Sequence, residues 1–359
     1  MSSNAESANE SRAKSQCLIS FGSNLGDRAD LIAEAAGRIA ISPLASGYGG
    51  LRTSRLFETP PIGGPGGQDP FLNAIGAFGT DATARDVLAL LQDLENELGR
   101  QRRRRWDARS IDLDVVLHGE LVGGGTGLIV PHPRYTARQF VLQPACDVAP
   151  HYRDPRFGWT LERLAKHLSA GVPSLALTGG DFQTRQRLIQ RLSAEHGITT
   201  FAAKQISEPM DVVGNAPAPS PLPVHESTPA RLGLDQAGAA ENEAKYNKPR
   251  TDEPQNFDGE PIAVTGVTPW VAAYIPPLPP LESEATDAAT VPRLVARLQR
   301  TTPQTRWPAP HQMWPTGWRW PEYRLEVDDL DWAVKEILSA LESMRCPLAA
   351  VTNDGQWWR

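Results

Sequence analysis

Residues 110–117 read Ser-Ile-Asp-Leu-Asp-Val-Val-Leu, a run in which apolar and polar side chains alternate. Alternation with a period of two predicts a β-strand, because successive side chains of a strand point to opposite faces. One face is expected to carry the carboxylates of Asp112 and Asp114, and the other face the side chains of Ile111, Leu113, Val115 and Leu117. Two carboxylates on one face repel each other unless a cation lies between them, and hard oxygen ligands favour Mg²⁺. A solvated strand edge is the alternative explanation of this spacing.

Six arginines lie just before this strand, within residues 100–109. Taken alone, a basic run is typical of a solvated face or of a nucleic-acid patch. Beside a Mg²⁺ site it favours a polyphosphate ligand, because guanidinium groups match phosphate oxygens bidentately. A net charge of −6 over 359 residues also argues against generic polyanion binding. We therefore expect no nucleic-acid partner, and an RNA-binding protein is the competing hypothesis.

A third group of side chains follows the strand. His132 can donate a hydrogen bond to phosphate, and Arg138 can neutralise phosphate charge. Phe140 and Phe71 can hold a flat heteroaromatic ring between them. Each of these residues alone is more often structural, so the prediction depends on their occurrence in one stretch of about 150 residues.

The sequence around these groups alternates strand and helix patterns, which predicts an α+β or α/β sandwich. One helix is expected after Asp30, which can cap it, and another after Thr83, whose spacing from Asp86 is a capping signal. The glycine- and proline-rich loop 59–67 is expected to be mobile. Strands are expected at residues 17–22, 51–58 and 71–78, and a closing helix at residues 159–168.

Composition divides the chain into five parts. The tail 1–15 has no apolar segment and is predicted to be disordered, whereas residues 16–170 are predicted to form one domain. A strand, tight turn and helix at residues 171–205 would begin a second unit. Residues 206–262 are predicted to be a largely disordered, proline-rich linker, since 21 of the 32 prolines lie after residue 205. Residues 263–359 regain apolar content and include an amphipathic helix near the end.

The second unit allows two interpretations. Its Gly179-Gly180 turn invites comparison with the phosphate loop of nucleoside kinases. However, Arg185, Gln186 and Arg187 stand where a phosphate loop would need glycine, lysine and Ser/Thr. We expect either a degenerate, inactive kinase-like domain of α/β structure or a protein-interaction domain, with the tryptophan-rich residues 307–320 as a candidate partner surface.

The cysteines are few and far apart, without the C-x-x-C spacing of zinc or redox sites, so a reducing cytoplasm is predicted. They are Cys17, Cys146 and Cys346. No run reaches the roughly 18 apolar residues that a membrane helix needs, and no membrane partner is expected.

Five groups of residues carry a resemblance to a known family. They are Gly22–Arg28, Thr59-Pro60-Pro61, Phe71-Leu72-Asn73, the residues Arg105-Trp106 with Arg109–Asp114, and the residues Val130–Arg134 with Arg138 and Phe140. In order and spacing, over residues 17–168, they resemble the 6-hydroxymethyl-7,8-dihydropterin pyrophosphokinase family of folate biosynthesis.

The resemblance implies a ferredoxin-like α+β fold and an ATP-dependent diphosphotransferase. The diphosphate of ATP would pass to the hydroxymethyl group of 6-hydroxymethyl-7,8-dihydropterin, with release of AMP. Two Mg²⁺ ions would be bound by Asp112 and Asp114, and Arg100 and Arg109 would stabilise the transferring group. ATP contacts are implied for Gln92, Glu95, Arg102, Arg109, Ile111, His132 and Arg138, and which of Arg102, Arg103 and Arg104 reaches phosphate stays open. Pterin contacts are implied for Thr59, Pro61, Ile62, Phe71, Asn73, Trp106 and Phe140.

Overall fold

The fold belongs to the predicted α+β class. A computed structural model describes residues 15–46, 49–100, 108–125, 127–203, 268–276, 291–300 and 320–359. The predicted linker 206–262 and most of the tryptophan-rich stretch lie outside the described residues, as do residues 1–14. The division of the chain at residue 170 stays a prediction. Among the described residues, no helix is long and apolar enough to cross a membrane.

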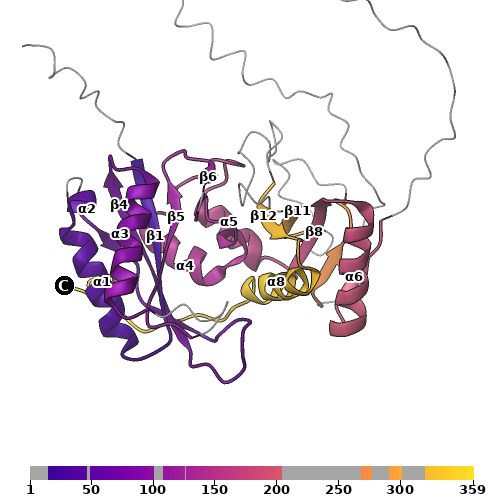
Figure 1. Cartoon of the computed structure of the whole chain (residues 1–359), viewed down its shortest axis with the longest axis horizontal. Helices are drawn as coiled ribbons and strands as arrows, with labels where there is room; N and C mark the ends of the chain where they lie inside the picture. The colour runs from indigo at the N-terminus through magenta and orange to yellow at the C-terminus, as the bar shows by residue number, and fades with distance from the viewer. Residues whose placement is uncertain are drawn as a thin grey trace, which may run out of the picture. The chain divides into compact units, whose positions relative to one another are not determined.

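The N-terminal part is built on an antiparallel sheet (Figure 1). Its order is β13-β3-β4-β1-β5, and β2 also pairs with β4. The strand bounds are Ser15–Ser23 for β1, Arg52–Thr53 for β2, Phe57–Thr59 for β3, Phe71–Thr80 for β4, Asp112–His118 for β5 and Ala349–Ala350 for β13. A separate hairpin joins β6 (Gly123–Gly125) and β7 (Leu128–Val130). β1 begins before the expected strand, at a residue that was assigned to the tail.

Two irregularities correct the expected strands. Leu18 pairs with Leu117, but the next residue, Ile19, pairs with Val115, so Val116 is an extra residue in β5. This bulge places Leu117 in the cluster on the opposite face of the sheet from Val115. The expectation that both side chains share one face is therefore wrong.

The expected strand 51–58 is also interrupted. It forms the two short strands β2 and β3. Thr53 pairs with Gly76 and Phe57 pairs with Asn73, so the segment 53–57 contains one residue more than the segment of β4 opposite it. In between, the hydroxyl of Ser54 accepts a hydrogen bond from the Ile75 backbone. The Ser54 backbone N–H still donates to the Ile75 carbonyl at 2.8 Å, so the side-chain hydroxyl takes over only the second half of the local pairing.

Helices α1 (Arg28–Ile41) and α3 (Ala84–Glu97) cover one face of this sheet, and the short helix α2 spans Pro43–Ser46. The capping signal at Thr83 is confirmed, since Thr83 and Asp86 form a reciprocal capping box. The cap predicted at Asp30 is wrong. Asp27 caps α1 and accepts from the Asp30 backbone, because the helix begins three residues earlier than its apolar pattern indicates.

The other face carries α4 (Gln139–Val148) and α5 (Leu161–Ser169), after a short 3₁₀ turn at Tyr135–Ala137. Beyond them lies a second sheet, in which all strands are parallel, in the order β12-β11-β8-β10-β9. Its elements are β8 (Ser174–Gly179), α6 (Phe182–His196), β9 (Thr199–Phe201), β10 (Trp270–Ala272), β11 (Leu294–Gln299), β12 (Glu322–Glu326) and α8 (Leu330–Ser343).

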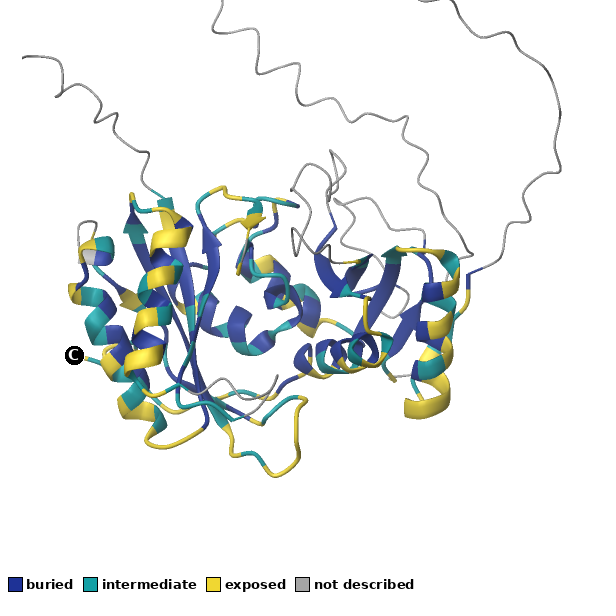
Figure 2. Cartoon of the chain, viewed as in Figure 1, coloured by how far each residue is buried: buried dark blue, intermediate teal, exposed yellow. Residues whose placement is uncertain are grey.

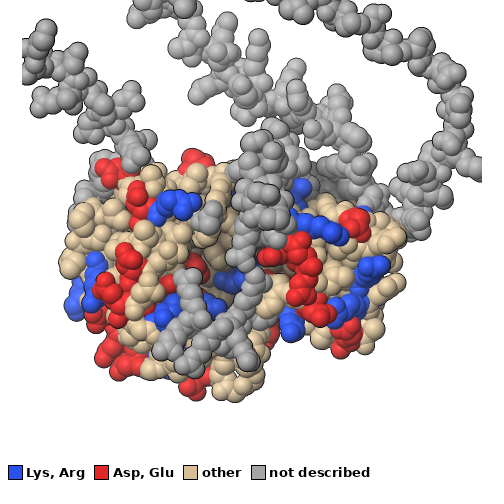
Figure 3. Space-filling view, viewed as in Figure 1, with Lys and Arg blue, Asp and Glu red and all other residues tan. Residues whose placement is uncertain are grey.

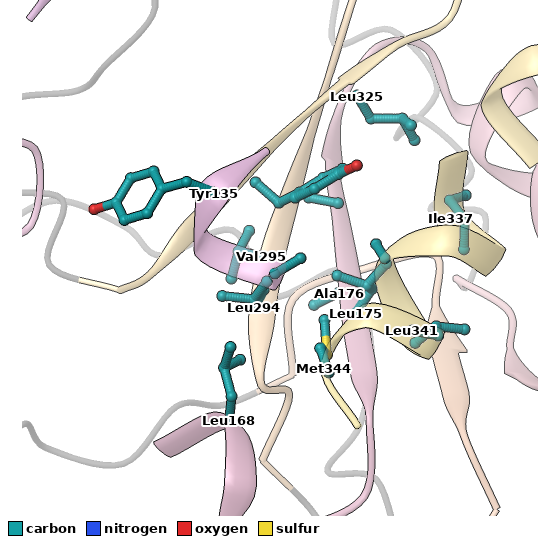
Figure 4. Packing of buried hydrophobic residues seen from close by; sticks show 14 of the residues in the cluster. Tyr135, Leu168, Leu175, Ala176, Leu294, Val295, Leu325, Ile337, Leu341 and Met344 are labelled. Atoms are coloured by element: carbon teal, nitrogen blue, oxygen red, sulfur yellow. The ribbon is translucent and has the colours of Figure 1, made fainter. Parts of the chain in front are cut away.

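One buried cluster joins the two sheets. It contains residues of α4 and α5 together with residues of β8, β11, β12 and α8, and Figure 4 shows Ile337, Leu341 and Met344 beside Leu175 and Ala176. Figure 2 shows the same buried layers along the strands of both sheets. The C-terminal region is thus packed onto the N-terminal part through a shared apolar core.

Candidate active site

A cavity of about 240 Å³ opens where β3 ends and where β4 and β5 begin. The loop after β7 and the first turn of α4 close its sides, and α8 contributes a further wall. Eleven predicted site residues line this cavity. They are Thr59, Ile62, Phe71, Asn73, Arg100, Arg109, Asp112, Asp114, His132, Arg138 and Phe140.

The two aspartates lie as the alternation predicts. Asp112 and Asp114 are two positions apart in β5, both half-buried, with Leu113 between them buried on the opposite side. Among the described residues, no three or more His, Cys, Asp and Glu side chains converge into a ready-made metal cage. The carboxylate pair therefore provides an incomplete set of hard oxygen ligands.

Arginines surround the aspartates. Arg100 reaches Asp112 Oδ1 at 2.6 Å, and Arg109 pairs with the other oxygen of the same carboxylate. Behind them, the buried carboxylate of Glu95 pairs with Arg100 and accepts the Leu113 backbone N–H at 2.8 Å. Glu95 thus holds Arg100 and the start of β5 in position without lining the cavity itself.

His132 is held as a neutral donor. Its Nδ1 accepts the Arg134 backbone N–H at 3.2 Å, and its Nε2 lies 4.0 Å from Asp114 Oδ2. Burial, followed by the charges of Arg138 and Arg134, lowers the pKa of His132 well below its ordinary value. Because Nδ1 is an acceptor, the proton of the neutral ring resides on Nε2, which is available to an anionic ligand.

The cavity lining also includes side chains that suit a flat ring. Phe71 and Phe140 both line it, and the Arg138 guanidinium lies 5.5 Å from the centroid of the Phe140 ring. The side chain of Asn73 is buried and donates to Thr59 Oγ1 at 2.8 Å. The lining thus combines aromatic surface with an oriented amide.

Helix α8 contributes residues that the sequence did not reveal. Ser339 and Ser343 line the cavity. Glu336, which is buried, pairs with Arg134 at 2.7 Å and accepts the hydroxyl of Tyr323 at 2.9 Å. The only sign of this role in the sequence was that Glu336, a charged residue, lies next to Ile337 on the apolar face of the helix.

Four predicted residues do not line the cavity. Ile111 is fully buried, and Gln92 is half-buried on α3. Glu95 is buried and contacts Arg100 and Leu113 without lining the cavity. Pro60 lines the cavity, whereas the neighbouring Pro61 does not. The predictions for Arg102 and Trp106 lie outside the described residues, together with Arg103 and Arg104.

Paired carboxylates, several guanidiniums and two phenyl rings lining one cavity are features typical of metal-dependent phosphoryl-transfer sites. Residues 18–150 match the family model for 7,8-dihydro-6-hydroxymethylpterin-pyrophosphokinase (HPPK). The chain is 36% identical over 135 residues to the 2-amino-4-hydroxy-6-hydroxymethyldihydropteridine pyrophosphokinase of Methylorubrum extorquens, covering 38% of this chain and 83% of that relative. It is 37% identical over 130 residues to the enzyme of the same name from Bacillus subtilis, covering 36% and 75%. The chain therefore belongs to the HPPK family.

A solved structure also matches in part. The HPPK-DHPS protein of Plasmodium falciparum, crystallised with pterin and p-hydroxybenzoate, is 13% identical with a TM-score of 0.36. The match covers 51% of this chain and 54% of that one, so the chain spans about half of that protein.

Proposed function

We propose that the cavity is where this chain transfers the diphosphate of ATP to the hydroxymethyl group of 6-hydroxymethyl-7,8-dihydropterin. The products are the pterin diphosphate and AMP, and the chain acts as a diphosphotransferase of folate biosynthesis. The observation that carries this proposal is the placement of Asp112, Asp114 and Arg109 in one cavity with Phe71 and Phe140. Phosphate chemistry and a planar ring are thereby brought within one site.

Asp112 and Asp114 are the residues that would hold two Mg²⁺ ions. The donor set fits, because Mg²⁺ in nucleotide enzymes usually takes one or two carboxylates and completes its shell with phosphate oxygens and water. In this structure Arg100 and Arg109 form ion pairs with the carboxylate of Asp112. When bound, Mg²⁺ would neutralise charge on the phosphate oxygens.

The chain's own residues bind and align the two substrates. Arg100, Arg109 and Arg138 offer guanidiniums to the phosphates, and His132 offers its Nε2 proton. Phe71 and Phe140 sandwich the pterin, and Asn73 and Thr59 meet its edge. Alignment of two bound reactants is worth roughly 7–11 kcal/mol of barrier, so no base of unusual pKa is required.

We infer a more specific fold class for each of the two sheet-containing parts. The order β5-β1-β4-β3, with helices after β1 and β4, supports a ferredoxin-like arrangement for the N-terminal part. The parallel order with β8 in the centre and α6 directly after it supports a degenerate kinase-like unit.

We propose that this second unit binds no nucleotide at its β8–α6 turn. Asp181 caps α6 and accepts the Thr184 backbone N–H at 2.7 Å, so a carboxylate occupies the position that favours phosphate. Arg185 donates to the carbonyls of Gly179 and Ala273 and is turned toward the turn's own backbone. Calorimetry on the full chain should give one ATP per chain, and two would overturn this proposal. The partner surface proposed at residues 307–320 involves residues outside the described part, apart from Trp320, which is buried.

The test of the main proposal is AMP release by the full chain. AMP should appear only when hydroxymethyldihydropterin and Mg²⁺ are both supplied. Salt-sensitive RNA binding without AMP formation would instead support the binding-protein hypothesis. On the face drawn in Figure 3, acidic and basic side chains are mixed among the described residues.

A further inference from the structure

A second chamber of about 300 Å³ adjoins the cavity and shares Arg109, Asp114, His132 and Arg134 with it. Of these shared residues, Arg109 and His132 are proposed phosphate ligands and Asp114 is a proposed Mg²⁺ ligand. A nucleotide whose phosphates lie among them can extend in only two directions within this pair of chambers. The first leads to the Phe71 end, and the second leads into the new chamber.

The walls of the second chamber suit a flat apolar ring. Val115 comes from β5 of the N-terminal sheet, and Leu128 and Ile129 come from β7 of the separate hairpin. The same chamber is lined by Trp332, a half-buried residue in the first turn of α8. An indole near aliphatic side chains provides the stacking surface that nucleotide bases use.

Glu326, at the end of β12, contributes the one carboxylate of this chamber that lies away from the phosphate ligands. It is half-buried, and no ion pair is recorded for it within the described part of the chain. A carboxylate repels phosphate but accepts a hydrogen bond from an amino group. Adenine presents an exocyclic amino group, whereas guanine presents a carbonyl oxygen at the equivalent position.

We propose that Glu326 and Trp332 form the base-recognition wall of the nucleotide site and select adenine over guanine. Both residues lie outside the stretch 18–150 that matches the family, so the C-terminal region supplies part of the catalytic cleft. This inference rests on the proposed function, because it takes ATP as the co-substrate. Trp332 stacks on the base, and Glu326 accepts from its amino group.

The experiment compares ATP with GTP in full-length variants, using pterin-dependent release of AMP or GMP. In Glu326→Gln the amide can donate to the guanine oxygen, so the ATP-over-GTP preference in kcat/KM should fall about tenfold or more. Trp332→Leu should raise KM for both nucleotides about tenfold, since stacking does not distinguish bases. Trp332→Phe keeps an aromatic plane and should stay within about twofold of wild type.

The control is Glu195→Gln, the same carboxylate-to-amide change at an exposed position on α6. It should leave the nucleotide preference unchanged. A wild-type preference in Glu326→Gln, or a wild-type KM in Trp332→Leu, would overturn the role assigned to that residue.

Calorimetry with AMP and GMP separates this inference from the proposed function, because it requires no turnover. If wild type favours AMP, Glu326→Gln equalises the two, and no pterin-dependent release occurs, the base wall stands and the proposed reaction fails. If release is normal and all variants bind AMP and GMP as wild type does, the base wall fails and the reaction stands.

Discussion

Arg134, in the loop after β7, forms an ion pair with Glu336 of α8 at 2.7 Å. The carboxylate is buried, and Tyr323 donates to its other oxygen at 2.9 Å. A backbone contact runs alongside, since Arg324 N–H donates to the carbonyl of Pro133 at 3.3 Å. The loop that carries His132 is therefore held by the C-terminal region.

We predict that Glu336→Gln lowers kcat/KM by about 10- to 100-fold, because Arg134 loses its ionic partner and leaves its position between the chambers. The measurement is pterin-dependent AMP release. On an Arg134→Ala background the same substitution should have no further effect, which a merely structural role would not produce. Independent, additive losses would contradict the prediction, and Glu195→Gln is the matched control.

We predict that Asp112→Ala and Asp114→Ala each reduce turnover by about 10³-fold or more, since the proposed Mg²⁺ ligands are removed. The fold should persist, with the melting temperature close to that of wild type, because both side chains are partly exposed in the cavity. The control is Asp147→Ala, which removes a carboxylate from an exposed pair with Arg55. Near-normal rates in either variant would remove the metal assignment.

We predict that Trp357→Ala destabilises the protein by about 2 kcal/mol, less than the loss at a fully buried tryptophan. The indole packs edge-on against Phe21, with ring centroids 6.3 Å apart, and donates to the carbonyl of Ser54 at 2.8 Å. KM for the pterin should also rise, because the neighbouring β3 carries Thr59. Denaturant unfolding and steady-state kinetics measure both effects, and Trp357→Phe should recover most of the stability. Unchanged unfolding in Trp357→Ala would show that this contact contributes little.

We predict an acid-side loss of stability that originates at His167. Burial, assisted by the charge of Arg293, lowers its pKa to about 3, while its ring donates to the Arg293 carbonyl at 3.0 Å. Below about pH 6.5 His167 is protonated in the unfolded chain but stays neutral in the folded chain. The free energy of unfolding therefore falls with pH until the folded-state pKa is reached. In His167→Gln the slope of unfolding free energy between pH 6 and 4 should be shallower by up to about 1.4 kcal/mol per pH unit. Above pH 7.5 the difference between the two proteins should be constant, and identical slopes at acid pH would exclude His167 as the source.

Local patterns predicted the parts of the site that depend on short-range geometry. The alternation at Asp112 and Asp114 was sufficient to place both carboxylates in the cavity, because the period of a strand is fixed by the backbone. The capping box at Thr83 was equally readable, since it involves only neighbouring residues. The residues themselves also suggested that Phe71 and Phe140 hold a flat ring at this site, and both line the cavity. The family resemblance identified that ring as a pterin.

The pairing between strands that are distant in the chain could not be predicted from the sequence. The bulge at Val116 depends on how β1 aligns with β5, and the sequence of β5 alone carries no sign of it. Glu95 was assigned to ATP, whereas its burial and its bond to Leu113 place it behind the cavity. The contributions of Glu326, Trp332 and Glu336 depend on the shared core, which no local pattern encodes.

Strand β13 has a consequence for biosynthesis. It pairs with β3, and the adjoining residues Thr53 and Gly355 are bonded although they are 302 positions apart. A ribosome working at roughly 5–20 residues per second needs tens of seconds to cover that distance. During this interval the nascent chain presents an open strand edge at β3, which is the kind of surface through which growing chains aggregate. Residues 349–350 cover this edge when they pair with β3, so a segment that is synthesised late protects a strand that is synthesised early.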